Sequence, residues 1–183
     1  MSTRNEIINI ADDLIRSKGF NAFSFSDISS SLGIKNASIH YHFPTKGALG
    51  ETVVQKHIND IEALIAMTQE WPPLNKLEAF MDIYSSEHSQ GNVCVVGSLS
   101  TDLNTVNEDM KAYLKELVFK ILNWVTDILE EGRSRNMFKF GVEPREKALL
   151  ICTNMLASLQ ITRLSGNDDF ELIKKTVIKE LTE

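Results

Sequence analysis

The side chains with the most suggestive chemistry lie in one short stretch, residues 35–46. They combine ammonium groups, an amide, hydroxyls, imidazoles and a small methyl group: Lys35, Asn36, Ala37, Ser38, His40, Tyr41, His42 and Lys46. Hydrogen-bonding groups and methyls of this kind read base edges in the major groove of DNA, while cationic groups anchor the phosphates. The stretch is therefore a candidate for binding to a nucleic acid duplex. The alternative is that it is plain solvated surface, which is the commoner role of a short helix of these residue types.

Two short helices separated by a glycine are expected to position this stretch. Ser24 and Asp27 have the spacing of a capping box, which predicts a helix over about residues 25–32. Gly33 ends that helix, and a third short helix follows over about residues 37–43. Helix, tight turn and helix together make up a helix-turn-helix motif.

The apolar side chains of the motif predict which way its second helix faces. A small core is expected from Phe20, Phe23, Phe25, Ile28, Leu32, Ile34, Ile39 and Phe43. Because Ile39 and Phe43 must face that core, the polar side chains are left on the outer side, and a helix of about two turns fits a groove ~12 Å wide. Lys46 opens the next helix beside free backbone N–H groups, which predicts a phosphate clamp.

Helical periodicity continues through the rest of the chain. A capping box at Thr3 and Glu6 opens a first helix that ends at Gly19. A long fourth helix begins near Lys46 and stops at the two prolines after Trp71. Further helices are expected at about 74–89, 100–106, 108–135, 144–164 and 168–182. The sequence thus predicts an all-α fold of about nine helices, divided into a helix-turn-helix domain over 1–48 and a larger helical domain over 49–183.

Composition limits the kind of protein. Of the 183 residues, 43% are hydrophobic, which is enough for a core that needs no metal or disulfide. Cys94 and Cys152 are too few and too far apart for a disulfide framework or a metal knuckle, so no metal and no cofactor are expected. The N-terminus lacks the apolar core of a signal peptide, and no apolar run approaches the ~18 residues that span a bilayer. We therefore expect a soluble, cytoplasmic protein without membrane contact.

The net charge of −6 at first argues against a polyanionic partner. The first fifty residues, however, carry five basic and four acidic side chains, a net charge of +1, which leaves −7 for the rest. DNA binding depends on the local field and on placed donors more than on the charge of the whole chain. The asymmetry is mild, and it supports the nucleic-acid interpretation without carrying it.

Residues 19–49 resemble the DNA-binding signature of the TetR family. The matching features are Gly19-Phe20, Ser24-x-x-Asp27-Ile28, Leu32-Gly33-Ile34, Ser38-Ile39, Tyr41-His42-Phe43 and Lys46-x-x-Leu49. The resemblance implies that Ser26, Lys35, Asn36, Ser38, His40 and Tyr41 lie nearest the bases, and that His42, Thr45 and Lys46 hold the phosphate backbone. Many relatives have Tyr where this chain has His40, so the individual base contacts differ here.

The resemblance also implies a helical sensor domain and a homodimer. In the family the last two helices pair with those of a second copy, which here would form a four-helix bundle. The candidate interface side chains are Cys152, Met155, Leu156, Leu159, Phe170, Ile173 and Val177. Taken alone, these apolar stripes fit an ordinary internal core equally well. A twofold dimer would present two recognition helices to a palindromic operator.

An effector pocket is implied for the same domain. The candidate lining residues are Trp71, Phe80, Tyr84, Cys94, Leu99, Met110, Tyr113, Leu117, Trp124 and Met155. Aromatic and Met side chains at helical spacing form plain core more often than a pocket, and Tyr and Trp are the better candidates because a buried O–H or N–H requires a partner. Residues 92–99 around Cys94 resemble a subgroup in which a cysteine senses electrophiles, and a buried, inert thiol is the alternative.

These inferences predict a ligand-responsive repressor that binds a palindromic DNA operator as a dimer and is released by a small molecule or a reactive electrophile. A helix-turn-helix protein could instead act through protein contacts. An all-helical enzyme is the other alternative, but the sequence has no nucleophile–base pair and no phosphate-binding glycine loop. His40 and His42 are two residues apart, so they lie on different sides of a helix and do not form a metal pair. We therefore predict that the chain is not an enzyme.

Overall fold

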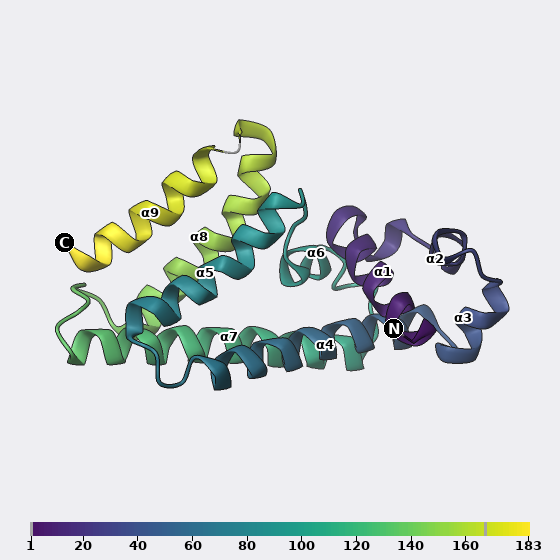
Figure 1. The fold of residues 1–183 in the computed structure, drawn as a ribbon, viewed down its shortest axis with the longest axis horizontal. Coiled ribbons are helices and arrows are strands. Elements are labelled where there is room, and N and C mark those ends of the chain that lie inside the picture. The colour runs from purple at the N-terminus through teal and green to yellow at the C-terminus, as the bar shows by residue number, and fades with distance from the viewer. Residues whose placement is uncertain (1, 167) are drawn as a thin grey trace. The chain divides into compact units, whose positions relative to one another are not determined.

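The computed structural model describes residues 2–166 and 168–183, and the regular structure of these residues is helical (Figure 1). Nine α-helices and one 3-10 turn, without a strand, make up the described parts of the chain. None of these helices has both the length and the apolarity needed to cross a membrane. The prediction of an all-α fold is confirmed.

The fourth helix ends at Met67, four residues before the predicted stop at Trp71. The other helix boundaries agree with the sequence prediction within about two residues, with one exception. In chain order the elements are α1 Thr3–Lys18, η1 Phe20–Ala22, α2 Phe25–Leu32, α3 Asn36–His42, α4 Lys46–Met67, α5 Pro73–Ser89, α6 Val95–Thr101, α7 Glu108–Ser134, α8 Pro144–Ser165 and α9 Asp168–Thr182. The exception is α6, which the sequence predicts over 100–106. Burial of Val95 and Leu99 outweighs the low helix propensity of Gly97, which weakens the helical signal of this segment in the sequence.

The start of α1 also differs from its prediction. The helix is capped by Ser2, whose backbone is extended and whose hydroxyl oxygen accepts the Asn5 N–H at 3.4 Å. Thr3 is already the first helical residue, so the predicted capping box of Thr3 and Glu6 is wrong. A hydroxyl caps a helix only from the residue that precedes its first turn, and here that residue is Ser2.

By compactness the chain divides into two units. The first contains Met1–Asp60 and Val95–Val118, and the second contains Ile61–Cys94 and Phe119–Glu183. Helices α4 and α7 each supply residues to both units. The predicted boundary between residues 48 and 49 separates a DNA-binding domain from a sensor domain by their functions, and it stays a prediction.

The core of the first unit is made by helices that are far apart in the sequence. Helix α1 packs against α2, α3 and α6. The fully buried side chains of this core include Ile7, Ala11 and Ile15 of α1, Ile28 of α2, Ile39 of α3, Leu49 of α4, Leu99 of α6 and Met110 of α7. This packing gives the two short helices α2 and α3 the support that helices of their length need in water.

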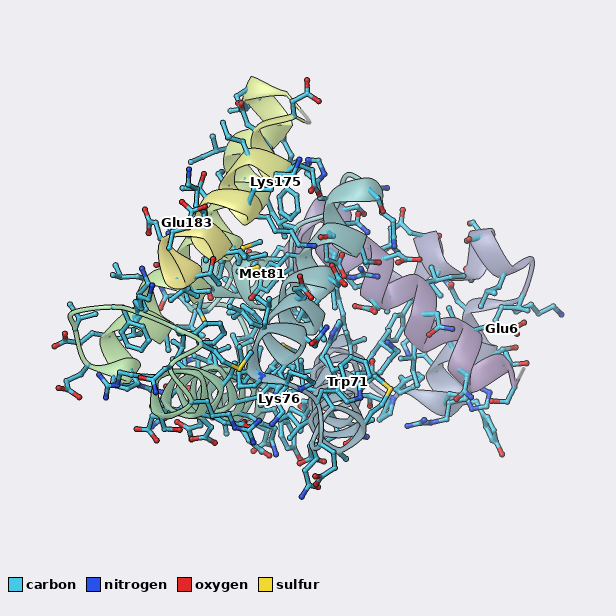
Figure 2. The ribbon with its side chains drawn as sticks, turned by 60° about the vertical axis from the view of Figure 1, so that its left-hand side comes forward. Glu6, Trp71, Lys76, Met81, Lys175 and Glu183 are labelled. Carbon is cyan, nitrogen blue, oxygen red and sulfur yellow. The ribbon has the colours of Figure 1, made fainter. Side chains whose placement is uncertain are left out.

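The second unit is built around α5, α8 and α9, which pack against one another (Figure 1). Phe80 and Phe170 are its largest fully buried side chains. Met81, labelled in Figure 2, is also fully buried, whereas Lys175 and Glu183 on the C-terminal side are exposed. The ring of His88 stacks on Phe170 at 4.5 Å between centroids.

Candidate nucleic-acid interface

A capping box opens the first helix of the helix-turn-helix motif, as predicted. The Asp27 carboxylate accepts the Ser24 N–H at 2.7 Å and the Ser24 hydroxyl at 2.6 Å. These hydrogen bonds hold the pKa of Asp27 below its usual value of 3.8. A charged carboxylate in the first turn also favours the helix dipole, so α2 begins at a defined residue.

The turn between α2 and α3 depends on Gly33. Its φ of 66° and ψ of 29° are left-handed, a conformation that costs other residues steric strain. The N–H of Ile34 donates to the Ser29 carbonyl at 3.1 Å, which satisfies a free carbonyl at the end of α2. The chain therefore reverses within three residues and enters α3 at Asn36.

Helix α3 turns one apolar edge inward and a polar side outward. Ile39 and Phe43 are buried, and they fasten the helix to the core of the first unit. The predicted DNA-contact side chains Lys35, Asn36, Ala37, His40 and Tyr41 are exposed, while Ser38 and His42 are half-buried. Tyr41 is 85% exposed, the largest fraction of any aromatic side chain that the structure describes. The structure thus brings the polar stretch together on the outside of a two-turn helix.

Two aromatic contacts steady this outer side. The ring of Phe25 in α2 meets His40 edge-on at 4.9 Å between centroids. Tyr41 and His42 form a second edge-on pair at 5.1 Å. Edge-to-face rings at these distances attract each other, so the imidazoles of α3 are partly ordered before any ligand binds.

Two of the DNA-contact candidates outside α3, Ser26 and Thr45, lie at exposed helix ends. Ser26 lies in the first turn of α2 and is exposed. Thr45 immediately precedes α4, and its hydroxyl oxygen accepts the Ala48 N–H at 3.1 Å. This capping role was not recognised in the sequence, although a Thr directly before a helix is a known signal for it. The bond uses the oxygen as an acceptor, so the O–H group can still donate to a phosphate.

Lys46 lies in a different setting from the open helix end that the sequence suggested. Its ammonium donates to the Phe23 carbonyl and lies 4.8 Å from the Phe20 ring centroid and 4.2 Å from that of Phe23. Burial lowers the pKa of Lys46, while the charges of Asp102 and Asp27 act in the opposite direction.

The segment between α6 and α7 forms hydrogen bonds with the residues before α2 and with α4. The sequence did not point to these contacts. The Asp102 carboxylate accepts the Phe20 N–H at 2.8 Å and the Asn21 side-chain amide at 2.9 Å. The same amide donates to the Thr105 hydroxyl at 2.8 Å. Asn107 donates to Glu51 of α4 at 2.6 Å. These pairs are more than fifty residues apart, so no local sequence signal reveals them.

A buried ionic cluster joins α1 to α4 within the first unit. Asp12 of α1 accepts from Arg16 at 3.0 Å and from the His57 ring at 2.7 Å, and Lys56 lies 3.6 Å away. Burial alone would raise the pKa of Asp12, but His57, Arg16 and Lys56 together hold it below 3.8. The carboxylate is therefore charged and paired at neutral pH.

The effector-pocket candidates fall into both units. Leu99, Met110 and Leu117 are buried in the first unit, and Tyr113 borders its open polar groove of about 670 Å³ between α1 and α4. In the second unit the Phe80 ring lies 5.3 Å from Tyr84 and 6.2 Å from Trp124. Phe80, Tyr84, Cys94 and Met155 are buried there, and Trp71 is exposed. Trp124 also borders a cavity of about 150 Å³ beside the Lys76–Glu131 ion pair, whose atoms lie 2.7 Å apart.

Burial governs the chemistry of the titratable groups near these rings. It raises the pKa of the Cys152 thiol to about 12 and that of the Tyr84 phenol well above 10.0. Both groups are therefore neutral at physiological pH. Cys94 is buried and Cys152 is half-buried.

The dimer candidates lie mostly on the inner sides of α8 and α9. Met155, Leu159, Phe170 and Val177 are buried within the second unit, while Cys152, Leu156 and Ile173 are half-buried. The exposed large apolar side chains of the same two helices are Leu149, Leu150, Ile161, Leu164 and Leu172. The structure separates the inner and outer sides of these two helices, and the dimer interface itself stays a prediction.

Comparison with known proteins gives matches along the whole chain. A family model described as bacterial regulatory proteins of the tetR family matches residues 7–53. An HTH-type transcriptional regulator from the lacX 3′ region of Lactococcus lactis is 25% identical over 122 residues, 63% of this chain and 62% of that relative. The match therefore spans less than two thirds of that relative's length.

Two further likenesses extend beyond the N-terminal part. The HTH-type transcriptional repressor DhaR of Mycobacterium sp. (strain GP1) is 21% identical over 145 residues, 77% of this chain and 72% of DhaR. The crystal structure of a TetR-family transcriptional regulator from Agrobacterium tumefaciens is similar with a TM-score of 0.91 at 26% identity, covering 98% of this chain and 97% of that one. The predicted resemblance is confirmed: residues 7–53 match the TetR family model, and the chain has the fold of a TetR-family transcriptional regulator. The proteins that it resembles are transcription regulators, in agreement with the prediction that this chain is not an enzyme.

Proposed function

We propose that this protein is a transcriptional repressor that binds a palindromic operator as a homodimer and is released by a small-molecule effector. The observation that carries the proposal is the outer side of α3, where five polar or small side chains stand exposed on a helix fastened by Ile39 and Phe43. The relative DhaR is named a repressor, which supports the same direction of control. A regulator of this kind would act in the cytoplasm, on the chromosome.

The proposed DNA contacts divide into base readout and backbone anchoring. Asn36, Ser38, His40 and Tyr41 would face base edges, together with Ser26 at the start of α2, and Ala37 would contact a thymine methyl. His42 and Thr45 would hold phosphates. The resemblance placed Lys35 near the bases, but we assign it to the phosphates because it lies at the N-cap position, before the first helical residue of α3. Helix α4 adds its free backbone N–H groups at the end that Thr45 caps.

The proposed dimer uses the exposed sides of α8 and α9. Leu150, Ala157, Ile161 and Leu164 recur at helical spacing on one exposed side of α8. Leu164 is 93% exposed and Leu172 of α9 is 62% exposed. Large leucines this exposed mark a surface that another apolar face covers, and the twofold mate of the same two helices would supply that face as a four-helix bundle. Two recognition helices about 34–36 Å apart would then face successive turns of the duplex.

The proposed effector acts by a shift of population. A ligand that binds the DNA-incompetent state more tightly than the competent state releases the operator. The aromatic group of Phe80, Tyr84 and Trp124 in the second unit is the best candidate for its contacts. Cys94 is buried, which favours a non-covalent effector over an electrophile.

The test is a DNA-binding experiment with the full-length purified chain. One probe is the duplex immediately upstream of its own coding region, and the control is a duplex of equal length from within that region. We expect binding to the upstream duplex about a thousandfold tighter than to the control, with an affinity that falls steeply between about 50 and about 200 mM KCl. Equal affinity for both duplexes, or affinity independent of salt, would contradict the proposal. A compound screen for release of the bound duplex then addresses the effector.

A further inference from the structure

Lys46 is half-buried, and its ammonium lies against two aromatic rings. The rings of Phe20 and Phe23 meet almost at a right angle, 89°, with centroids 6.1 Å apart. Both rings are buried, and the ammonium lies against each of them, at 4.8 Å and 4.2 Å from the centroids. It also donates a hydrogen bond to the carbonyl of Phe23. A compact cation over two aromatic faces with a carbonyl acceptor is a satisfied group.

Two carboxylates, those of Asp102 and Asp27, favour the charged form of Lys46. The Asp102 carboxylate is held in place by the Phe20 N–H and the Asn21 amide, and its charge raises the pKa of Lys46 against the effect of burial. Asp27 acts in the same direction. A phosphate that drew Lys46 outward would have to break the carbonyl bond and both ring contacts.

The contact also closes a segment of the chain. Phe20 and Phe23 come directly before α2, and Lys46 comes directly after α3 and the Pro44–Thr45 turn. Residues 24–45, which contain the whole helix-turn-helix motif, therefore run between two points that Lys46 joins. Fixing the ends of a segment reduces the orientations open to the helices within it.

We propose that Lys46 is a positioning residue that closes the helix-turn-helix segment and sets the orientation of α3, and that it does not neutralise a DNA phosphate. This assigns Lys46 a role different from the phosphate clamp that its place in the sequence suggested. The inference rests on the proposed function, because the orientation of α3 matters only if α3 meets DNA.

The experiment compares salt slopes and thermal midpoints of full-length variants. The variants are Lys46→Met, which keeps the stem but removes the charge, Lys46→Arg, which keeps a cation for the rings, and Phe23→Leu, which leaves the lysine intact. Lys35→Met is the matched control, since Lys35 is exposed at the N-cap of α3. Affinity for the upstream duplex is measured by fluorescence anisotropy across a series of KCl concentrations.

We expect Lys46→Met to weaken DNA binding about tenfold at every salt concentration, with an unchanged slope of log affinity against log salt and a lower thermal midpoint. Phe23→Leu should do the same, and Lys46→Arg should restore most of the affinity. Lys35→Met should leave the midpoint unchanged and flatten the slope by about 1.8, since a twofold dimer loses two phosphate contacts.

The opposite pattern would overturn the inference. If Lys46→Met flattened the slope as much as Lys35→Met and kept the wild-type midpoint, Lys46 would be a phosphate ligand. If the Phe23→Leu variant bound the upstream duplex with wild-type affinity, the ring contacts would be excluded as the means by which Lys46 positions α3. A wild-type chain that bound neither the upstream duplex nor the control would refute the proposed function itself, and the midpoints of the Lys46 variants would still decide where the ammonium is held.

Discussion

Asp12 is the residue at which charge and burial conflict most directly in the first unit. Its carboxylate is almost fully buried, and a lone carboxylate there would be costly. Arg16 of the same helix and His57 of α4 surround it with donors at 3.0 and 2.7 Å. Pairing of this kind adds little net stability compared with an apolar pair, but removal of one partner is expensive because the other remains buried. The cluster therefore makes the α1–α4 contact specific.

We predict that Asp12→Asn lowers the free energy of unfolding by about 3 kcal/mol at pH 7, because the buried Arg16 guanidinium loses the charge of its buried carboxylate partner. Since the pKa of Asp12 is lowered in the folded protein, its contribution is complete above about pH 4 and is lost as the pH falls through the folded value. Urea denaturation from pH 7 downward should show the difference between wild type and variant shrinking below pH 4.

The neighbouring carboxylate supplies the control for this prediction. Asp13 also pairs with Arg16, at 2.7 Å, but its side chain is 63% exposed. Asp13→Asn should change stability by no more than about 0.5 kcal/mol, because exposed ion pairs are screened by solvent. A difference between wild type and Asp12→Asn that grew as the solution was acidified would contradict the assignment.

At the scale of elements, the recognition helix depends on the turn that precedes it. Gly33 is left-handed, and a Cβ built on it meets no atom within 4 Å. Any cost of a side chain at this position is therefore backbone strain and not a clash. The helix boundary is encoded by conformation alone, in a single residue.

We predict that Gly33→Ala destabilises the protein by about 1 kcal/mol, which corresponds to a decrease of about 2–4 °C in thermal midpoint for a chain of this size. Differential scanning calorimetry would measure it. Gly141→Ala is the matched control, since a Cβ there also meets nothing within 4 Å and the backbone is not left-handed. Equal midpoints for the two variants would show that the turn tolerates a side chain without strain.

At the scale of the whole molecule, assembly depends on which side of α8 faces outward. Ile161 and Leu164 stand in solvent in the single chain, and Met155 and Leu159 on the same helix are buried. A DNA-binding dimer on a palindrome binds more tightly than a monomer because the two half-sites act together. Loss of the outer side of α8 should therefore weaken DNA binding without touching the DNA-binding face.

We predict that Ile161→Asp converts the proposed dimer into a folded monomer, because a buried, unpaired carboxylate at the proposed interface would oppose association. Light scattering after size exclusion should give half the wild-type mass, and affinity for the upstream duplex should fall at least about tenfold. Met67→Asp is the control, since Met67 is a similarly exposed apolar residue outside α8 and α9. An Ile161→Asp chain that remained dimeric would place the interface elsewhere.

Signals between near neighbours in the chain are enough to specify the local geometry of the helix-turn-helix. The Ser24–Asp27 capping box, the left-handed Gly33 and the spacing of Ile39 and Phe43 act over a few residues, so their consequences follow from the neighbours in the chain. The outward side of α3 and the all-α class follow from the same short-range signals.

Roles that depend on contacts between residues far apart in the chain became apparent only in the folded molecule. Asp102 contacts Phe20 across 82 residues, and Lys46 meets the ring of Phe23, so neither role has a local signature. Helix α8 carries apolar residues on two sides, and periodicity cannot distinguish the side covered by its own chain from the side left in solvent. The low propensity of Gly97 was likewise outweighed by the burial of its neighbours in α6. Burial belongs to the packed molecule, and packing brings together groups that the chain order keeps apart.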